Sequence, residues 1–266
     1  MADTQRPRVG VVKLASCDGC QLTLLDLEDE LLPIVGRFDL VEFPEATSNR
    51  SHGPYDVLLV EGSVSTEEQA EEIVDLRSRT KILVSIGACA TAGGIQALRN
   101  WADEPSYRAS VYPHPEFISS LAMATPIADH VQVDAELRGC PIAPGQLLEL
   151  LTALRVGRRP QLPAEAVCLS CKRAGYECVL VARNMPCLGP VTVAGCGALC
   201  PAFSRGCYAC FGPREEANVD ALHDWLSQDR PPGEVDRLFA GFTGWAPAFQ
   251  PPAQRAVIAK EAETDA

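Results

Sequence analysis

The chain has 266 residues, of which 35 are acidic and 23 are basic, so that its formal net charge is -12. This acidic balance, without any basic cluster, argues against a nucleic-acid partner and favours a protein or a small molecule. Although 47% of the residues are hydrophobic, no apolar run reaches the roughly 18 residues of a membrane-spanning helix. The first residues lack the charged and apolar regions of a signal peptide, and we therefore expect a cytoplasmic protein with no membrane segment.

Apolar, β-rich runs predict five strands in the first 160 residues. These runs are RVGVVKLAS at 8–16, FDLVEF at 38–43, YDVLLVEGS at 55–63, KILVSIG at 81–87 and HVQVDAEL at 130–137. The segment from Thr66 to Arg79 opens with acidic residues and closes with basic ones, which predicts a helix. Alternating strands and helices imply a parallel sheet with helices on both faces, and we expect a flavodoxin-like α/β domain over residues 1–160.

Twelve cysteines are distributed unevenly along the chain. In a chain without an export signal they cannot form an ordinary disulfide framework, because the cytosol keeps thiols reduced. Four are spread over the first 140 residues and eight crowd between residues 168 and 210. We therefore expect a second, small cysteine-rich domain over residues 161–266.

The four early cysteines all follow predicted strands. Cys17 and Cys20 follow the first strand, Cys89 follows KILVS, and Cys140 follows the last strand of the domain. The carboxyl ends of the strands form the edge at which doubly wound sheets bind ligands. A redox dithiol would need only the CxxC pair, whereas a cubane cluster would use all four thiolates. Glycines that suit tight turns beside a bulky inorganic group stand next to these cysteines, at Gly19, Gly87 and Gly139.

The later cysteines are spaced C-x2-C-x6-C-x8-C-x8-C-x3-C-x6-C-x2-C. Eight thiolates with interleaved glycine and proline are enough for two metal sites of four thiolates each. Zinc ribbons also use CxxC pairs, so zinc is an open alternative here. The Cys200-Pro201 dipeptide and the companion site in the first domain favour iron-sulfur clusters.

Several segments resemble the small subunits of cytosolic nickel-iron hydrogenases, in particular the delta subunits of NAD(P)-linked sulfhydrogenases. They are ASCDGCQLTLLDL, VEGSV, SIGACATAGG, GCP and PCLGPVTVAGCGALCPAFSRGCYACFGP, within residues 8 to 215. The resemblance implies an electron-transfer subunit between an H2-activating large subunit and diaphorase subunits that bind flavin, NAD(P) and iron-sulfur clusters. The chain itself shows no general base or nucleophile, so we expect no catalytic site in it.

The resemblance also implies three 4Fe-4S clusters. Ligands of the proximal cluster, nearest the nickel site, would be Cys17, Cys20, Cys89 and Cys140. Those of the distal cluster would be Cys168, Cys171, Cys178 and Cys187. Those of the medial cluster would be Cys196, Cys200, Cys207 and Cys210.

Two positions depart from the better-known uptake hydrogenases. Those relatives place a histidine where this chain has Cys168, and they lack a medial thiolate where it has Cys200. All-thiolate clusters carry more negative charge, which lowers the reduction potential and suits a nicotinamide acceptor. Alternatives are another acceptor, such as a deazaflavin or a heterodisulfide reductase, and a zinc-stabilised interaction module. The first domain also resembles a subunit of respiratory complex I, which has an adjacent pair of cysteines instead of CxxC.

The remaining conspicuous residues predict structural roles. Asp18 is interpreted as a helix N-terminal acid. An aromatic repeat at three- and four-residue steps predicts a packed helical face, part of which could contact another subunit, at Phe239, Phe242, Trp245 and Phe249. The closing residues AKEAETDA are expected to be disordered. Solvated or structural side chains are expected at His52, His114, His130 and His223.

Overall fold

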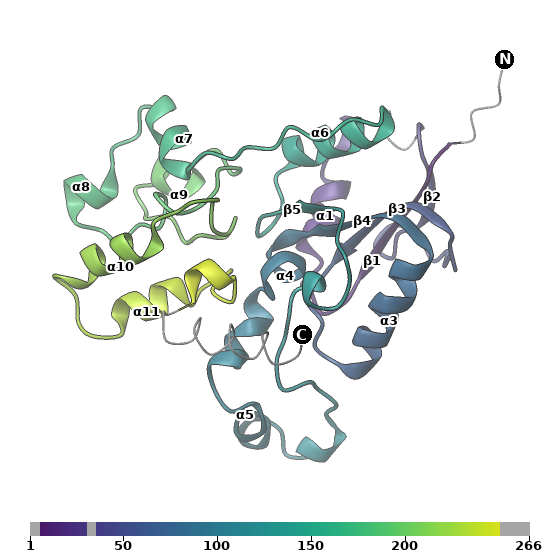
Figure 1. Cartoon of the computed structure of the whole chain (residues 1–266), viewed down its shortest axis with the longest axis horizontal. Coiled ribbons are helices and arrows are strands. Elements are labelled where there is room, and N and C mark those ends of the chain that lie inside the picture. The colour runs from purple at the N-terminus through teal and green to yellow at the C-terminus, as the bar shows by residue number, and fades with distance from the viewer. Residues whose placement is uncertain (1–5, 31–35, 251–266) are drawn as a thin grey trace. The chain divides into compact units, whose positions relative to one another are not determined.

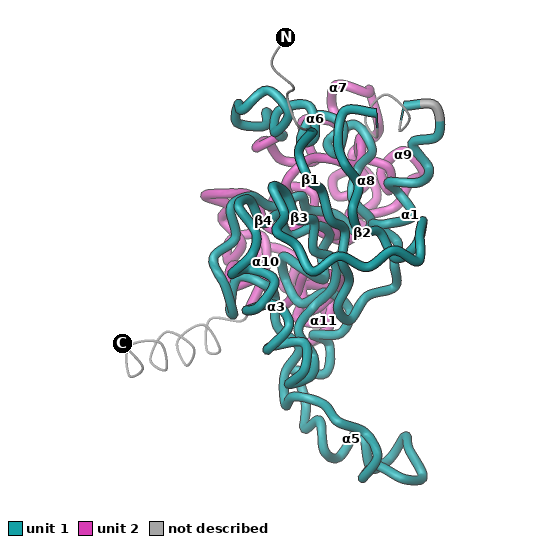
Figure 2. Tube along the Cα trace, turned by 90° about the vertical axis from the view of Figure 1, so that its right-hand side faces the viewer, with its two compact units in different colours: residues 1–162 teal, residues 163–266 magenta. Residues whose placement is uncertain are grey.

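The computed structural model of the chain describes residues 6–30 and 36–250 (Figure 1). The chain divides into two compact units, residues 1–162 and 163–266 (Figure 2). This division falls two residues after the expected boundary at residue 160. Within the described ranges, no helix is long and apolar enough to cross a membrane. The AKEAETDA segment lies outside the described residues.

The first unit contains a parallel sheet of five strands in the order β2-β1-β3-β4-β5 (Figure 1). This is the strand order of a flavodoxin-like doubly wound sheet, so the predicted α/β architecture is confirmed for this unit. The strands are β1 (Arg8–Lys13), β2 (Asp39–Glu42), β3 (Tyr55–Glu61), β4 (Thr80–Ile86) and β5 (Ala135–Leu137).

Four of these strands end side by side. In the sheet register, Lys13 pairs with Glu61, Glu61 with Ile86, and Ile86 with Leu137. These residues are the last ones of β1, β3, β4 and β5. The loops that follow therefore leave the sheet from one common edge, which is where the early cysteines lie.

Helices cover both faces of the sheet. On one face, α1 (Gly19–Leu25) and α6 (Pro144–Arg155) contribute to a buried cluster with Val11, Leu59 and Ile86. On the other face, α3 (Glu67–Ser78) packs on a cluster that includes Leu58 and Leu83. Burial on both faces explains why the central strands are almost continuously apolar.

The helix predicted over residues 66–79 is confirmed as α3. The side chain of Thr66 accepts a hydrogen bond from the backbone N–H of Gln69 at 3.3 Å and caps the helix. Glu67 and Glu68 occupy the first turn and Arg77 the last turn. These charges complement the partial charges at the two helix ends.

The strand expected over residues 130–137 is shorter than predicted. Only Ala135–Leu137 pairs with β4, and the preceding residues follow the 3-10 helix η4 (Ile127–Asp129). The carboxylate of Asp134 accepts the backbone N–H of Leu83 at 2.8 Å. In a regular sheet the N–H of Leu83 would donate to a backbone carbonyl of the neighbouring strand. Because the Asp134 side chain accepts this N–H instead, the pairing of β5 with β4 begins only at Ala135.

The segment between β4 and β5 is built from short helices. They are α4 (Gly87–Ala92), η2 (Ile95–Trp101), α5 (Glu104–Val111), η3 (Pro115–Phe117) and η4. An additional short helix, η1 (Glu28–Glu30), follows α1. The chain thus leaves the thiol-bearing edge after β4 and returns to it only at the end of β5.

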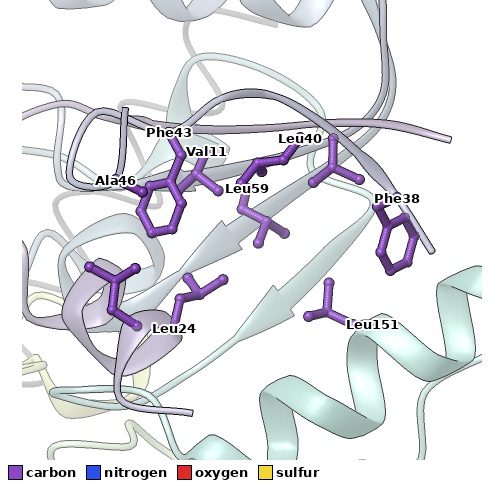
Figure 3. A pocket seen from close by; sticks show the side chains of 10 residues that line it. Val11, Leu24, Phe38, Leu40, Phe43, Ala46, Leu59 and Leu151 are labelled. Atoms are coloured by element: carbon purple, nitrogen blue, oxygen red, sulfur yellow. The ribbon is translucent and has the colours of Figure 1, made fainter. Parts of the chain in front are cut away.

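An apolar cavity of about 170 Å³ lies between the sheet and the helices of the first unit. Its lining includes Val11 and Leu59 from the sheet, Leu24 from α1 and Leu151 from α6 (Figure 3). All of the described residues that line it are apolar. A substrate site needs a few placed polar groups to fix orientation, so this cavity is a gap in the core packing.

The second unit is made of short helices around a small core. The helices are α7 (Val167–Arg173), α8 (Val179–Arg183), α9 (Leu199–Ala202), α10 (Val219–Ser227), α11 (Glu234–Phe239) and η5 (Pro247–Phe249). Part of the buried core is formed by two of the cysteines, Cys187 and Cys207, together with Val167 and Val179. These two thiols thus belong to the core of this unit.

The prediction of one aromatic helical face near the end of the chain is wrong. Helix α11 ends at Phe239, and Phe249 belongs to the separate helix η5. The two rings still meet, because their centroids are 5.8 Å apart in an edge-to-face arrangement. A Cβ at Gly244 would lie 2.6 Å from the Cα of Ala240, so a tight glycine turn replaces the expected helix.

Candidate metal centres

The CxxC turn after β1 is held by a charged pair. The ammonium group of Lys13 donates to the Asp18 carboxylate at 2.6 Å, and the hydroxyl of Ser16 donates to the same carboxylate at 3.0 Å. Asp18 adopts a left-handed conformation with φ 65° between Cys17 and Cys20. It occupies the N-cap position of α1 but makes no capping hydrogen bond. Asp18 therefore lies at the N-terminus of α1 as predicted, and its carboxylate also forms an ion pair with Lys13 in the CxxC turn.

A buried carboxylate supports the second cysteine of this turn. Glu61, the last residue of β3, is 2% exposed and accepts the backbone N–H groups of Cys20 at 3.1 Å and Gln21 at 3.2 Å. These N–H groups lie in the first turn of α1, where no intrahelical acceptor exists. Burial raises the pKa of Glu61, although the two N–H donors act in the opposite direction.

No site role was predicted for Glu61 from the sequence. The available signal is an acidic residue that closes the apolar run VLLVE. A charge at the end of a strand buried on both faces is costly unless a specific partner binds it. Its partners are 40 and 41 positions earlier in the chain, so local pattern could not identify them.

Two glycines make room for the sulfur atoms. Gly87 has φ +86°, and a Cβ at this position would collide with the Sγ atom of Cys20. Gly94 has φ +62°, and a Cβ there would lie 2.5 Å from the Sγ atom of Cys89. Both the backbone conformation and the close approach require glycine at these positions. The close approach seen at Gly87 is to the sulfur atom of Cys20, and the approach to an inorganic group at Gly19, Gly87 and Gly139 stays a prediction.

Hydrogen bonds join the three cysteine-bearing loops. The backbone N–H of Ala88, in the loop of Cys89, donates to the carbonyl of Gly139 at 2.7 Å. The side chain of Gln96, at the start of η2, donates to the carbonyl of Ala15 at 2.8 Å. The loops after β1, β4 and β5 are therefore fixed relative to one another.

The four early thiols share one electrostatic environment. Burial raises the pKa of Cys20 and Cys140, and it raises the pKa of Cys89 to about 11. Each of these thiols is further affected by at least one other cysteine of the set, and Cys17 acts on both Cys89 and Cys140. The structure therefore brings together the four cysteines that were predicted to meet. The raised pKa values favour the neutral thiols while no cation is bound, and metal binding would require their deprotonation.

The first four cysteines of the second unit also lie together. Cys168 and Cys171 lie three residues apart on α7, which places them on one face of the helix. Cys178 precedes α8, and Cys187 is buried after it. Burial raises the pKa of Cys168 to about 11, and all three of the other thiols act on it in the same direction.

The last four cysteines form a second group in this unit. Its members are Cys196, Cys200, Cys207 and Cys210. Burial raises the pKa of Cys200, and the thiols of Cys196 and Cys187 add to this shift. Burial likewise raises the pKa of Cys207 to about 12, with Cys187 and Cys210 as further contributors. Cys187 thus lies near both groups, and its assignment to one cluster stays a prediction.

Backbone N–H groups donate to two of the sulfur atoms. The N–H of Cys207 donates to the Sγ atom of Cys187 at 3.2 Å, and the N–H of Ala209 donates to the Sγ atom of Cys207 at 3.4 Å. Such bonds stabilise negative charge on sulfur and tune the metal group that it binds. Among the described side chains, no group of three or more His, Cys, Asp or Glu has the arrangement of a single-ion site.

Among the described residues, the hydrogen bonds of the histidine side chains involve no cysteine. His130 is 2.8 Å from the hydroxyl of Thr125, and His223 is 2.8 Å from the carboxylate of Asp236. His114 is exposed beside Glu116, and His52 is exposed.

The chain is similar to known proteins in sequence and fold. Residues 17–154 match the family described as NADH ubiquinone oxidoreductase, 20 Kd subunit. The chain is 38% identical over 238 residues to the sulfhydrogenase 2 subunit delta of Pyrococcus furiosus, with 90% of this chain and 100% of the relative covered. It is 31% identical over 239 residues to a subunit of the F420-non-reducing hydrogenase of Methanocaldococcus jannaschii, with 79% of this chain and 83% of the relative covered.

A solved structure agrees with these relatives. The structure of an NAD+-reducing NiFe hydrogenase in the H2-reduced state matches with a TM-score of 0.56 and 31% identity. The match covers 60% of this chain and 96% of that chain. The likeness therefore extends to both sequence and fold over more than half of the chain.

Proposed function

Since the chain belongs to the family of NADH ubiquinone oxidoreductase 20 kDa subunits and to the small subunits of nickel-iron hydrogenases, we propose that it relays electrons in a cytoplasmic, NAD(P)-linked hydrogenase. In this proposal the H2-activating large subunit supplies the electrons, and a diaphorase partner with flavin and iron-sulfur groups takes them. The chain would hold three 4Fe-4S clusters on its twelve cysteines. The reaction is an oxidoreduction of H2, to which this chain contributes no catalytic acid or base.

The proposal is carried by the meeting of four thiols at one edge of the sheet. Cys17, Cys20, Cys89 and Cys140 come from three loops and share one environment. An all-thiolate donor set of this kind suits a 4Fe-4S cluster. When bound, such a cluster takes up and gives back one electron at a time. The collisions that a Cβ would cause at Gly87 and Gly94 support a site built around sulfur.

The surrounding residues of the chain position these thiols. Glu61 fixes the backbone of Cys20, and the pair of Lys13 and Asp18 fixes the turn between Cys17 and Cys20. Outer residues of this kind commonly set the geometry and the potential of a metal site.

The two later sets would hold the distal and medial clusters. The distal set is Cys168, Cys171, Cys178 and Cys187. The medial set is Cys196, Cys200, Cys207 and Cys210. The mutual effects among the thiols of each set support this division, and Cys187 is the member whose place most needs a test.

The acceptor is proposed to be a nicotinamide. The NAD+-reducing enzyme among the solved structures supports this choice, as does the low potential expected of all-thiolate clusters. The relative from an F420-non-reducing hydrogenase supports a second candidate, in which the same type of subunit serves a heterodisulfide reductase. A deazaflavin remains a third acceptor to compare.

The test is H2-driven reduction by the complex purified anaerobically with its large subunit. We expect NADP+ or NAD+ to be reduced by the wild-type complex, and we expect this activity to be lost in Cys89→Ser, since a proximal ligand is removed. Ser106→Ala, on the exposed helix α5, is the matched control and should keep the activity. Reduction of a deazaflavin or of a heterodisulfide in place of nicotinamide would move the assignment to that acceptor.

A further inference from the structure

Two segments of the second unit cross beside its buried thiols. The backbone N–H of Cys207 donates to the Sγ atom of Cys187 at 3.2 Å, and the backbone N–H of Leu188 donates to the carbonyl of Cys207 at 3.0 Å. Both cysteines are buried. Both polar backbone groups of Cys207 are therefore bonded to the segment of Cys187 and Leu188, although Cys187 lies 20 positions earlier in the chain.

The crossing depends on Gly206. This residue is buried, and a Cβ at its position would collide with the carbonyl oxygen of Pro186 and would lie 3.2 Å from the Cα atom of Cys187. Both of these are backbone atoms, so neither can turn aside as the end of a flexible side chain can. The close approach of the two backbone segments therefore requires a glycine here.

Sulfur atoms of the proposed distal set also lie at this crossing. A Cβ at Gly189 would be 3.3 Å from the Sγ atom of Cys187 and 3.6 Å from the Sγ atom of Cys168. The same point lies 3.7 Å from the Cβ atom of Cys207, which belongs to the proposed medial set. Side chains from both sets thus surround a single glycine.

We propose that the hydrogen bond from Cys207 to Cys187 is the link through which electrons pass between the medial and the distal set, with Gly206 as the positioning residue that keeps this link short. The inference rests on the proposed function and adds the route between two of its clusters. The route follows the Sγ, Cβ, Cα and N atoms of Cys207, and the N–H then meets the Sγ atom of Cys187. Electronic coupling decays less along covalent and hydrogen bonds than across a gap of the same length.

The same hydrogen bond acts on a redox potential. An N–H group that donates to sulfur stabilises the additional negative charge of a reduced cluster and so raises its reduction potential. In the proposed division Cys187 is a distal ligand. Loss of the bond should therefore lower the potential of the distal cluster and slow the electron that arrives there.

Each passage across the link moves one electron. The group held by the medial set is oxidised by one electron, the group held by the distal set is reduced by one electron, and no covalent bond forms or breaks. The electrons come from H2, which gives two protons and two electrons at the large subunit, and they leave to the nicotinamide-reducing partner.

The experiment uses the anaerobic complex of the full chain with its large subunit. Gly206→Ala places a methyl group against Pro186 and parts the two segments. Gly241→Ala is the matched control in the same unit, because a Cβ there would meet only contacts of 3.5 and 3.9 Å. Neither glycine has a positive φ, so neither variant adds the strain of a left-handed residue.

The oxidised complex is mixed with H2, frozen at increasing times and examined by electron paramagnetic resonance. A redox titration gives the potential of each cluster, and the iron content and the free energy of unfolding are measured for every variant. We expect Gly206→Ala to delay reduction of the distal cluster behind that of the medial cluster by about tenfold or more, as for other contacts that support metal ligands. The distal potential should also fall, and Gly241→Ala should match wild type in both measurements.

A milder variant covers the case in which Gly206→Ala does not retain its iron. Gly189→Ala brings a methyl group to 3.3 Å from the Sγ atom of Cys187, so that the sulfur has to move only slightly. We expect a smaller delay and a smaller fall of the distal potential, both in the same direction.

Simultaneous reduction of the two clusters, with an unchanged distal potential, would overturn the link in a variant that retains the iron of wild type. An equal delay in Gly241→Ala would also overturn it. A fall of the medial potential alone would place Cys187 in the medial set and would likewise refute the link. These three outcomes leave the proposed function intact, whereas a wild-type complex without iron would overturn the proposed function and the link together.

Discussion

Glu61 performs a task that a capping side chain usually performs. A carboxylate from the end of β3 accepts the first free N–H groups of α1, so one residue fixes both the start of the helix and the position of Cys20. No described basic residue forms a salt bridge with it. The negative charge of the Glu61 carboxylate is therefore stabilised by the two backbone N–H groups that it accepts.

Replacement of this carboxylate should destabilise the first unit. Glu61→Gln turns one acceptor oxygen into an NH2 donor that faces a backbone N–H, and a lost buried acceptor costs about 1–3 kcal/mol. We expect a corresponding decrease in the free energy of unfolding, measured by urea titration of the anaerobic chain, and a lower iron content. The control is Glu71→Gln on the exposed side of α3. A decrease no larger than that of the control would contradict this role.

A substitution at Gly87 tests whether collision with a sulfur atom adds to the strain of a left-handed backbone. Gly87→Ala should cost the strain of a left-handed residue, about 1–2 kcal/mol, and should also force the Sγ atom of Cys20 to move. Gly157→Ala is a matched control, because Gly157 has φ +69° and a Cβ there would meet nothing within 4 Å. We expect both variants to lose stability but only Gly87→Ala to lose the proximal electron paramagnetic resonance signal. Loss of the signal in both, or in neither, would refute the collision.

At the scale of elements, Tyr55 joins the start of β3 to β2. Its hydroxyl lies 2.6 Å from both the Glu42 carboxylate and the carbonyl of Ser51. Burial, followed by the neighbouring Glu42, raises the pKa of Tyr55 to about 12. The neutral form is therefore favoured in the folded state relative to the unfolded chain.

This shift predicts alkaline sensitivity. Because the folded pKa is above the unfolded value of about 10, the contribution of Tyr55 is complete below pH 10 and is lost as the pH rises toward 12. Tyr55→Phe should lower the free energy of unfolding by about 1 kcal/mol at pH 8 and weaken the loss between pH 10 and 12. Urea unfolding at several pH values measures both effects, with exposed Tyr107→Phe as control. An unchanged pH profile in Tyr55→Phe would contradict the assignment.

The elements that could be predicted from the sequence are those whose burial leaves a regular pattern. Strands β3 and β4 are apolar throughout because both faces are covered, and α3 carries its own cap and end charges. The short β5 and the aromatic segment could not be predicted, since the side chain of Asp134 and the turn at Gly244 act through specific tertiary contacts.

The same distinction applies to the candidate site. The meeting of the four early cysteines followed from strand order alone, because parallel strands end at one edge. The support from Glu61 could not be predicted, since its partners are 40 and 41 positions away in the sequence. The helix-terminal position of Asp18 was predicted, but its ion pair with Lys13 was not.

At the scale of the whole molecule, the all-thiolate ligand sets should determine which acceptor can be reduced. Cys168→His would exchange a thiolate for a neutral imidazole, so the midpoint potential of the distal cluster should rise. Each rise of about 59 mV makes reduction of a one-electron acceptor tenfold less favourable. Redox titration followed by electron paramagnetic resonance measures the shift, and a parallel loss of H2-driven NADP+ reduction is expected. An unchanged or lower potential would show that Cys168 is not a ligand.

The measurement that tests the central claim most directly is the content of iron, acid-labile sulfide and zinc per chain, on protein purified without oxygen. Three clusters of four iron and four sulfide on twelve thiolates predict about twelve of each and little zinc. One or two zinc with little iron would contradict the electron relay. The cysteine-rich unit would then be a zinc-stabilised module, and the CxxC turn of the first unit would have to be reconsidered as a dithiol.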